Sequence, residues 1–147
     1  MMTGAVQFFL TDDLAKIEIT KFATRNGERV RIRSPKSGDA LEFDALALEA
    51  LSWQTSDSIL SWGAGPMTSN LGNGQVQVEV EFAVVNEFAA VKVRKLQADG
   101  RELLSVQSPL EGHSIILDVP TLLGLCKQPT EIISQWLETP WGPEEKK

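Results

Sequence analysis

Four side chains in this sequence are of types that enzymes use for catalysis, so their spacing decides whether they could act together. His113 is the only histidine and is expected in a turn, while Cys126 is the only cysteine and is expected to be a small core residue of a helix. Asp44 and Asp118 each come directly before an apolar helix, where a carboxylate caps the free amide groups of the first turn. No group of His, Cys and Asp has metal-ligand spacing. We therefore expect no metal, no cofactor and no catalytic residue, and whether the protein is an enzyme stays open.

Basic side chains offer a different chemistry, the binding of phosphate groups. Alternation along the predicted strands places a set of them on the outward faces of sheets, where they could follow a nucleic-acid backbone: Lys16, Arg29, Arg31, Arg33, Lys92 and Arg94. The alternative is the ordinary solvated side of an antiparallel sheet. Glu18, Glu42, Glu79 and Glu81 are expected on the same faces and would partly cancel the charge. The phenylalanines are assigned mostly to inward positions, which would leave these faces without aromatic rings for base stacking.

These candidates are positioned by a unit of roughly 54 residues that occurs twice, as its alternating and helical apolar periods show. The two copies align without gaps at an offset of 74 residues, the separation of Lys21 and Lys95. The aligned pairs keep the turn residues, the helix cap and the apolar positions: Ser34-Pro35 with Ser108-Pro109, Gly38 with Gly112, Asp44 with Asp118, Leu48 with Leu122, Leu51 with Leu125, Ile59 with Ile133, and Trp62 with Trp136. A single register over this span indicates an internal duplication.

Within each copy the apolar period changes from two to helical. Residues 16–20 and 29–33 alternate as half-buried strands do, and Asn26-Gly27 between them is a hairpin turn signal. A third strand is expected at 40–43, and the alternating segment ahead of each copy supplies another. The predicted organisation is a first ββββα unit at 1–62, a linker at 63–74, a second ββββα unit at 75–139 and a tail at 140–147.

A unit of this size buries a small core alone, so the two copies are expected to bury each other's helices. The predicted fold class is α+β: an intramolecular pseudo-dimer of tandem ββββα units, with curved antiparallel sheets outside and the helices at the interface. The outward arginines of residues 29–33 are replaced in the second copy by Leu103, Ser105 and Gln107. One copy could therefore have kept a binding face while the other changed its role, although drift after duplication explains the difference equally well.

Bulk composition sets limits on function. Apolar residues make up 42% and charged residues 23% of the 147 residues, as in globular proteins. The net charge of −6 is unfavourable for nucleic-acid binding on average, although the basic residues are clustered. Neither a signal peptide nor an apolar run long enough for a membrane span is present, so a cytoplasmic protein without a membrane partner is expected.

The order of antiparallel strands, a capping Asp and an amphipathic helix resembles the positive-cofactor-four type of transcriptional coactivator. The resemblance is carried by Val30 to Trp62, with LEFDALALEALS at its centre, and again by ILDVPTLLGLCK. It implies sheets that grip single-stranded DNA, and the Whirly proteins are similar in placing two such units in one chain. A half-unit also looks like short bacterial proteins labelled dihydrodiol dehydrogenase. The chain has no GxGxxG motif and no room for a dinucleotide fold, so that activity is not expected.

Two functions of different class follow. The first is binding of single-stranded nucleic acid, in a transcription-regulatory role, on the basic sheet face of the first unit. The second is a non-DNA accessory protein, or a cofactor-independent small-molecule protein of a biosynthetic pathway, with a cavity between the units near Trp53 and His113. The sequence leaves open whether the protein is a monomer or a homodimer.

Overall fold

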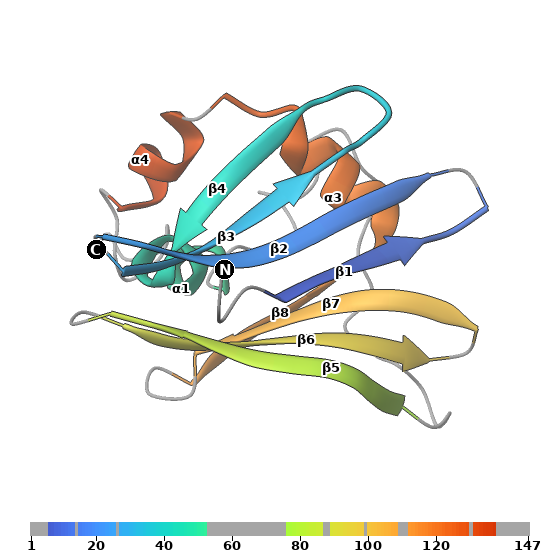
Figure 1. Cartoon of the computed structure of the whole chain (residues 1–147), viewed down its shortest axis with the longest axis horizontal. Coiled ribbons are helices and arrows are strands. Elements are labelled where there is room, and N and C mark those ends of the chain that lie inside the picture. Colours follow the sequence, from blue (N-terminus) through green and yellow to red (C-terminus); the bar gives the residue numbers. More distant parts are fainter. Residues whose placement is uncertain are drawn as a thin grey trace, which may run out of the picture.

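The protein is described by a computed structural model that covers residues 6–13, 15–25, 27–52, 76–86, 89–98, 100–108, 112–129 and 131–137. Its first unit holds four strands and a helix: β1 (Val6–Thr11), β2 (Lys16–Thr24), β3 (Gly27–Arg33), β4 (Ala40–Asp44) and α1 (Ala45–Ser52). The second unit repeats that order and continues into a second helix, whose matching segment in the first unit lies outside the described residues: β5 (Val76–Val85), β6 (Ala90–Ala98), β7 (Arg101–Ser108), β8 (His113–Leu117), α3 (Val119–Cys126) and α4 (Glu131–Leu137). The predicted tandem ββββα architecture is confirmed (Figure 1).

Each unit forms one four-stranded antiparallel sheet in which neighbours in the sequence are neighbours in the sheet, β1-β2-β3-β4 and β5-β6-β7-β8. Period-two alternation fixes the faces: Ile17, Ile19, Val30 and Ile32 are buried, and the residues between them are not. Gly27 has a φ of 118°, which only glycine adopts readily in the turn before β3. The predicted strand pattern is thus the pattern that the fold uses.

The helices begin where the sequence predicts them. The Oδ1 atom of Asp44 accepts a hydrogen bond from the backbone N–H of Ala47 at 2.8 Å, and Oδ1 of Asp118 accepts from that of Thr121 at 3.0 Å. Both aspartates therefore cap helices, as their position before an apolar run indicates. Such a cap stabilises a helix by about 1 kcal/mol, which gives these two carboxylates a complete structural role.

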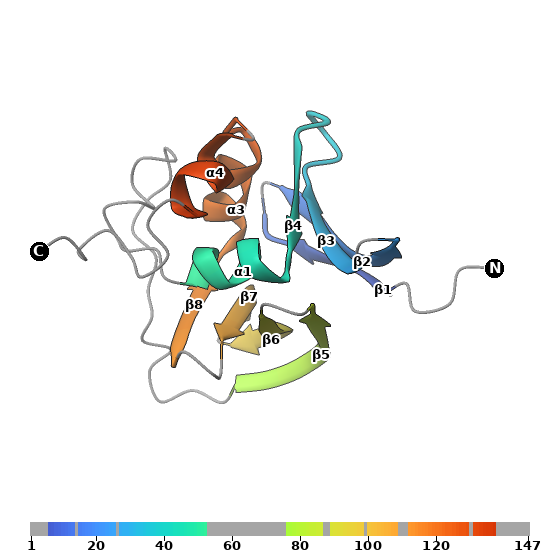
Figure 2. The ribbon, with the colours of Figure 1, turned by 90° about the vertical axis from the view of Figure 1, so that its left-hand side faces the viewer.

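Each helix crosses to the sheet of the other unit. α1 lies against β6, β7 and β8, whereas α3 lies against β2, β3 and β4. The helices occupy the angle between the two sheets, and the opposite sheet faces point outward (Figure 2). Two hydrogen bonds join the units at these contacts: Ser108 Oγ donates to Glu49 Oε2 at 2.9 Å, and Cys126 Sγ donates to the carbonyl of Ile32 at 3.5 Å. The units are therefore joined by a reciprocal exchange of helices.

Residues at matched positions of the repeat meet across the interface. Phe8 and Phe82, which are 74 positions apart, contact each other with ring centroids separated by 6.1 Å. The backbone N–H of Thr11, at the end of β1, donates to Oε1 of Glu102 at 2.7 Å. The matched contact runs the other way, from the N–H of Val85, at the end of β5, to Oε1 of Glu28 at 3.2 Å. Paired contacts of this kind are what an approximate two-fold relation between the units produces.

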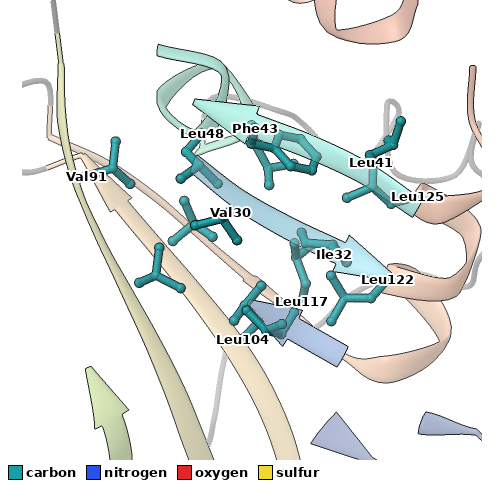
Figure 3. Close-up of a cluster of buried hydrophobic side chains, with 14 of the residues drawn as sticks. Val30, Ile32, Leu41, Phe43, Leu48, Val91, Leu104, Leu117, Leu122 and Leu125 are labelled. Atoms are coloured by element: carbon teal, nitrogen blue, oxygen red, sulfur yellow. The ribbon is translucent and has the colours of Figure 1, made fainter. Parts of the chain in front are cut away.

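The core lies between the sheets and is shared by both units. Leu48 and Leu51 of α1 and Leu122 and Leu125 of α3 are buried, with exposures of at most 1%. Side chains of both sheets and both helices meet in one apolar cluster (Figure 3). Among the described residues no helix is long and apolar enough to cross a membrane.

Candidate nucleic-acid interface

The outer face of the first sheet is open to solvent, whereas its inner face is covered by α3. Its thirteen side chains alternate with the core residues along the four strands: Gln7, Phe9, Thr11, Lys16, Glu18, Thr20, Phe22, Arg29, Arg31, Arg33, Ala40, Glu42 and Asp44. None of these side chains is buried. This set is called the first outer face below, and it contains four of the predicted binding residues.

Two aromatic rings lie on the first outer face, where the sequence analysis expected none. Phe9 is 37% exposed, and Phe22 is half-buried. The expectation was wrong because the continuous apolar run at residues 8–10 conceals the alternation. Phe8 and Leu10 point into the core, and the ring between them must therefore point out. The absence of a stacking surface no longer counts against this face.

Two of the arginines on the face are held by glutamates on neighbouring strands. Arg31 Nε lies 3.2 Å from Glu42 Oε2, and Arg33 Nη1 lies 2.9 Å from Glu18 Oε1. All four side chains remain partly exposed, so each pair contributes only about 0–1 kcal/mol to stability. The predicted partial cancellation of charge is therefore present, but it consists of weak ion pairs that a polyanion could open.

The other two cations of the face lie beside the aromatic rings. Lys16 Nζ is 4.9 Å from the centroid of the Phe9 ring. Arg29 is directly opposite Phe22 in the pairing of β2 with β3, and Cζ of Arg31 is 5.1 Å from the centroid of the Phe22 ring. Neither Lys16 nor Arg29 makes an ion pair with a described residue. Each ring thus has next to it a cation that makes no ion pair with a described residue, although Asp44 lies opposite Arg29 on β4.

The two rings are far enough apart to serve two different bases. Phe9 pairs with Glu18, four positions before Phe22 on the adjacent strand. A rise of about 3.3 Å per residue and a strand spacing of about 4.8 Å then separate the two rings by roughly 14 Å. A base sandwiched between two rings would require about half that separation. The face therefore offers two separate stacking positions, one on β1 and one on β2, with the arginines on the next strand, β3.

The outer face of the second sheet differs in both charge and access. Lys92 and Arg94 lie there, but both contact the same carboxylate, Glu81, at 3.9 and 2.9 Å. At the centre of this face Leu96 and Leu103 are buried, with exposures of 6% and 1%. They belong to a small second apolar cluster. The centre of this face is therefore closed, and within the described residues the open surface that combines cations with aromatic rings is the first outer face.

The candidate catalytic groups do not assemble into a site within the described residues. Cys126 is buried against β3, and burial raises the pKa of its thiol to about 12, so the thiolate that a nucleophile needs is not formed near neutral pH. His113 is the first residue of β8 and pairs with Ser108. Trp53 and the side chain of His113 lie outside what the structure describes, so the predicted pocket near them stays a prediction. The described residues contain no group of His, Cys, Asp and Glu that could hold a metal ion.

No family model matches this chain, and no curated protein is significantly similar to it. Its function has to be argued from the surfaces described above.

Proposed function

We propose that the protein binds single-stranded nucleic acid on the first outer face, as a transcription-regulatory module of the kind that the positive-cofactor-four and Whirly resemblance implies. The observation that carries this proposal is the pairing of each outward ring with an unpaired cation, Phe9 with Lys16 and Phe22 with Arg29. Single-strand binders combine these two elements, because rings stack on bases of any sequence while cations follow the phosphates.

The free energy of stacking on a base exceeds that of the cation–π contacts that the two rings make in the free protein. A cation–π contact at an exposed site contributes about 0.5–1 kcal/mol. Stacking of a base on an aromatic side chain contributes about 1–3 kcal/mol. A base can therefore displace the Lys16 ammonium from Phe9, which frees it to contact a phosphate, or the Arg31 guanidinium from Phe22, which stays paired with Glu42 until that ion pair opens.

The charge of the face sets the expected salt dependence. For single strands the logarithm of the affinity falls with the logarithm of salt concentration at a slope of about −0.7 per neutralised phosphate. The two unpaired cations, Lys16 and Arg29, give a slope of about −1.4. Opening the ion pairs of Arg31 and Arg33 would bring it to about −2.8. Binding is expected to be weak, without sequence preference, and strongest at low salt.

The test is fluorescence anisotropy of a labelled single-stranded oligonucleotide of about 12 nucleotides, a length within the range of single-strand binding sites, titrated with protein at several salt concentrations. The repeat itself supplies matched substitutions. Phe22→Leu introduces the residue found at the matched position 96, and it is expected to weaken binding about 5- to 150-fold through the loss of one stacked base. Arg94→Thr gives the second sheet the residue that the first sheet has at the matched position 20, and it is expected to leave binding unchanged.

A gain of binding provides the sharper control. Glu42→Gln removes the partner of Arg31 and is expected to tighten binding and steepen the salt slope by about 0.7, the contribution of one additional phosphate contact. A substitution that merely damages the fold cannot produce this result. Absence of binding at low salt, or equal loss in Phe22→Leu and Arg94→Thr, would contradict the proposal.

A further inference from the structure

A pocket of about 770 Å³ lies at the junction of the two units, next to one end of the first outer face. The turn between β1 and β2 and the turn between β3 and β4 form two of its sides, and the C-terminal end of α3 from the second unit forms another. Its lining includes Lys16, Lys36 and Lys127 as well as the apolar residues Ala15, Pro35 and Leu123. The pocket is therefore built by both repeats, as the second function hypothesis requires, although it is not shown to include Trp53 or His113.

Unpaired positive charge is concentrated at this pocket. Among the cationic side chains that the structure describes, those that make no ion pair with another described residue are Lys16, Arg25, Arg29, Lys36 and Lys127. Three of these five, the lysines, line the pocket. The net charge of the chain is −6, yet three lysines without an ion-pair partner among the described residues gather at this pocket. Such a gathering favours an anion as the ligand.

The carboxylates of the lining do not remove this preference. Asp12 is engaged in its own turn, where Oδ1 accepts a hydrogen bond from the N–H of Ala15 at 2.9 Å. Asp13 is exposed, as are Lys16, Lys36 and Lys127, so water screens all of these charges alike, and three lysines against two aspartates leave the lining with an excess of one positive charge. The end of α3 would repel an anion, but the N–H of Lys127 donates to the carbonyls of Gly124 and Leu125 there. The Lys127 ammonium further offsets the negative end of the helix dipole.

We propose that this pocket binds the phosphate group of a phosphate monoester. A phosphate dianion has three strong acceptor oxygens, and each lysine supplies up to three donors on a flexible stem. The volume exceeds what one phosphate fills and lies within the range of about 300–1,000 Å³ that is typical of small-molecule sites. The apolar lining by Ala15, Pro35 and Leu123 leaves room for the organic part of the ligand.

Two sources could present that group. One is a free phosphorylated small molecule, which would make the pocket a ligand site independent of nucleic acid. The other is the terminal phosphate of a strand lying on the first outer face, because Lys16 belongs both to that face and to the pocket. This second source rests on the proposed function, whereas the first does not.

The experiment uses the full chain and adenosine monophosphate, with adenosine as the matched compound without phosphate, in titrations followed by backbone amide NMR shifts. Adenosine monophosphate is expected to bind and adenosine to cause no shifts at the pocket. The double substitution Lys36→Gln with Lys127→Gln is expected to weaken binding about tenfold or more, since charge-assisted hydrogen bonds are lost. Arg25→Gln removes an unpaired cation outside the pocket and is expected to change nothing. Unchanged thermal unfolding of the double variant excludes loss of the fold.

Oligonucleotides with a terminal phosphate or a terminal hydroxyl, at either end, distinguish the sources. Tighter binding of a phosphorylated oligonucleotide that disappears in the double lysine variant supports the pocket as a strand-end site. Binding of adenosine monophosphate without any such difference supports a small-molecule site. If adenosine monophosphate does not bind and phosphorylated and hydroxyl oligonucleotides bind equally, the pocket proposal is overturned. Binding of the hydroxyl oligonucleotide to the first outer face would then still stand.

Discussion

Removal of the Glu102 carboxylate tests how the two units are held together. Oε1 of Glu102 accepts from the backbone N–H of Thr11 at 2.7 Å, and Oε2 lies 3.8 Å from Lys95 Nζ. The matched Glu28 makes the equivalent contacts to Val85 and to a lysine, at 3.2 and 3.4 Å. The Glu102 contact with the backbone is shorter, and its side chain is less exposed, 21% against 36% for Glu28. The same substitution at the two positions should therefore have unequal effects.

A hydrogen bond to a charged group contributes about 1.5–3 kcal/mol when it is well shielded. Glu102→Ala is expected to fall near the lower limit, about 1–2 kcal/mol, because Thr11 is exposed and water can replace part of the contact. Lys95 also keeps Glu79 as a partner at 3.4 Å. Glu28→Ala is expected to cost less than about 1 kcal/mol, as exposed pairs do. For a chain of this size, 1 kcal/mol corresponds to a shift in Tm of about 2–4 °C.

The measurement is urea unfolding of both variants and the parent protein, monitored by circular dichroism. The free energies of unfolding are compared at equal m values. The predicted order of stability is parent, then Glu28→Ala, then Glu102→Ala. An effect of Glu28→Ala as large as that of Glu102→Ala would refute the reasoning, because it would mean that distance and exposure do not determine the strength of these contacts. Two effects within error of zero would show that neither Glu28 nor Glu102 contributes measurably to the joining of the units.

Two further outcomes follow from the same structure. The Cys126 thiol, with a pKa of about 12 when buried and 9.0 when free, should resist alkylation in the folded protein at pH 8 and react once the chain is unfolded. As pH rises from about 9 to 12, the thiol loses its proton in the unfolded chain before it does so in the folded protein, so the free energy of unfolding should fall over that range. Cys126→Ser should make this fall less steep. An unchanged slope would exclude the thiol as its cause. If the chain is cut between residues 62 and 75, neither fragment alone should unfold cooperatively, because α1 and α3 each pack on the sheet of the other unit. Mixing the fragments should restore cooperative unfolding. A fragment that unfolds cooperatively alone would contradict this exchange of helices between the units.

The architecture could be predicted because the internal repeat can be detected in the sequence itself. One register aligns turns, caps and apolar positions, and the strand period and helix caps then follow locally. That the copies bury each other's helices was expected from the small core that one unit can form alone, and not from any local signal. Leu48 and Leu122 occupy matched positions on equally apolar helix faces. Both sheets offer these leucines similar surfaces of β-branched residues. The sequence therefore holds no local signal that a helix packs on the sheet of the other unit rather than on its own.

Only part of the candidate site could be predicted from the sequence. The outward cations followed from alternation, and continuing the count from Lys16 through Thr20 reaches Phe22, so one ring could have been found. Glu28 and Glu102 also differ by the repeat offset, a signal that was present but not used. The closed face of the second sheet was harder to foresee, although the uninterrupted buried run at 103–106 is typical of a strand covered on both faces. The lysine pocket depends on how the units meet, which no local pattern encodes.

The most direct measurement for the central claim is a backbone amide NMR titration of the full chain with a single-stranded oligonucleotide at low salt. Binding on the first outer face predicts the largest shifts at Phe9, Phe22, Arg29 and Arg31, with small shifts along residues 103–106 of β7. The shifts should reverse as salt is added, because phosphate contacts are screened. Shifts concentrated on the second sheet, or none at any protein concentration, would contradict the assignment of the first outer face as a nucleic-acid interface.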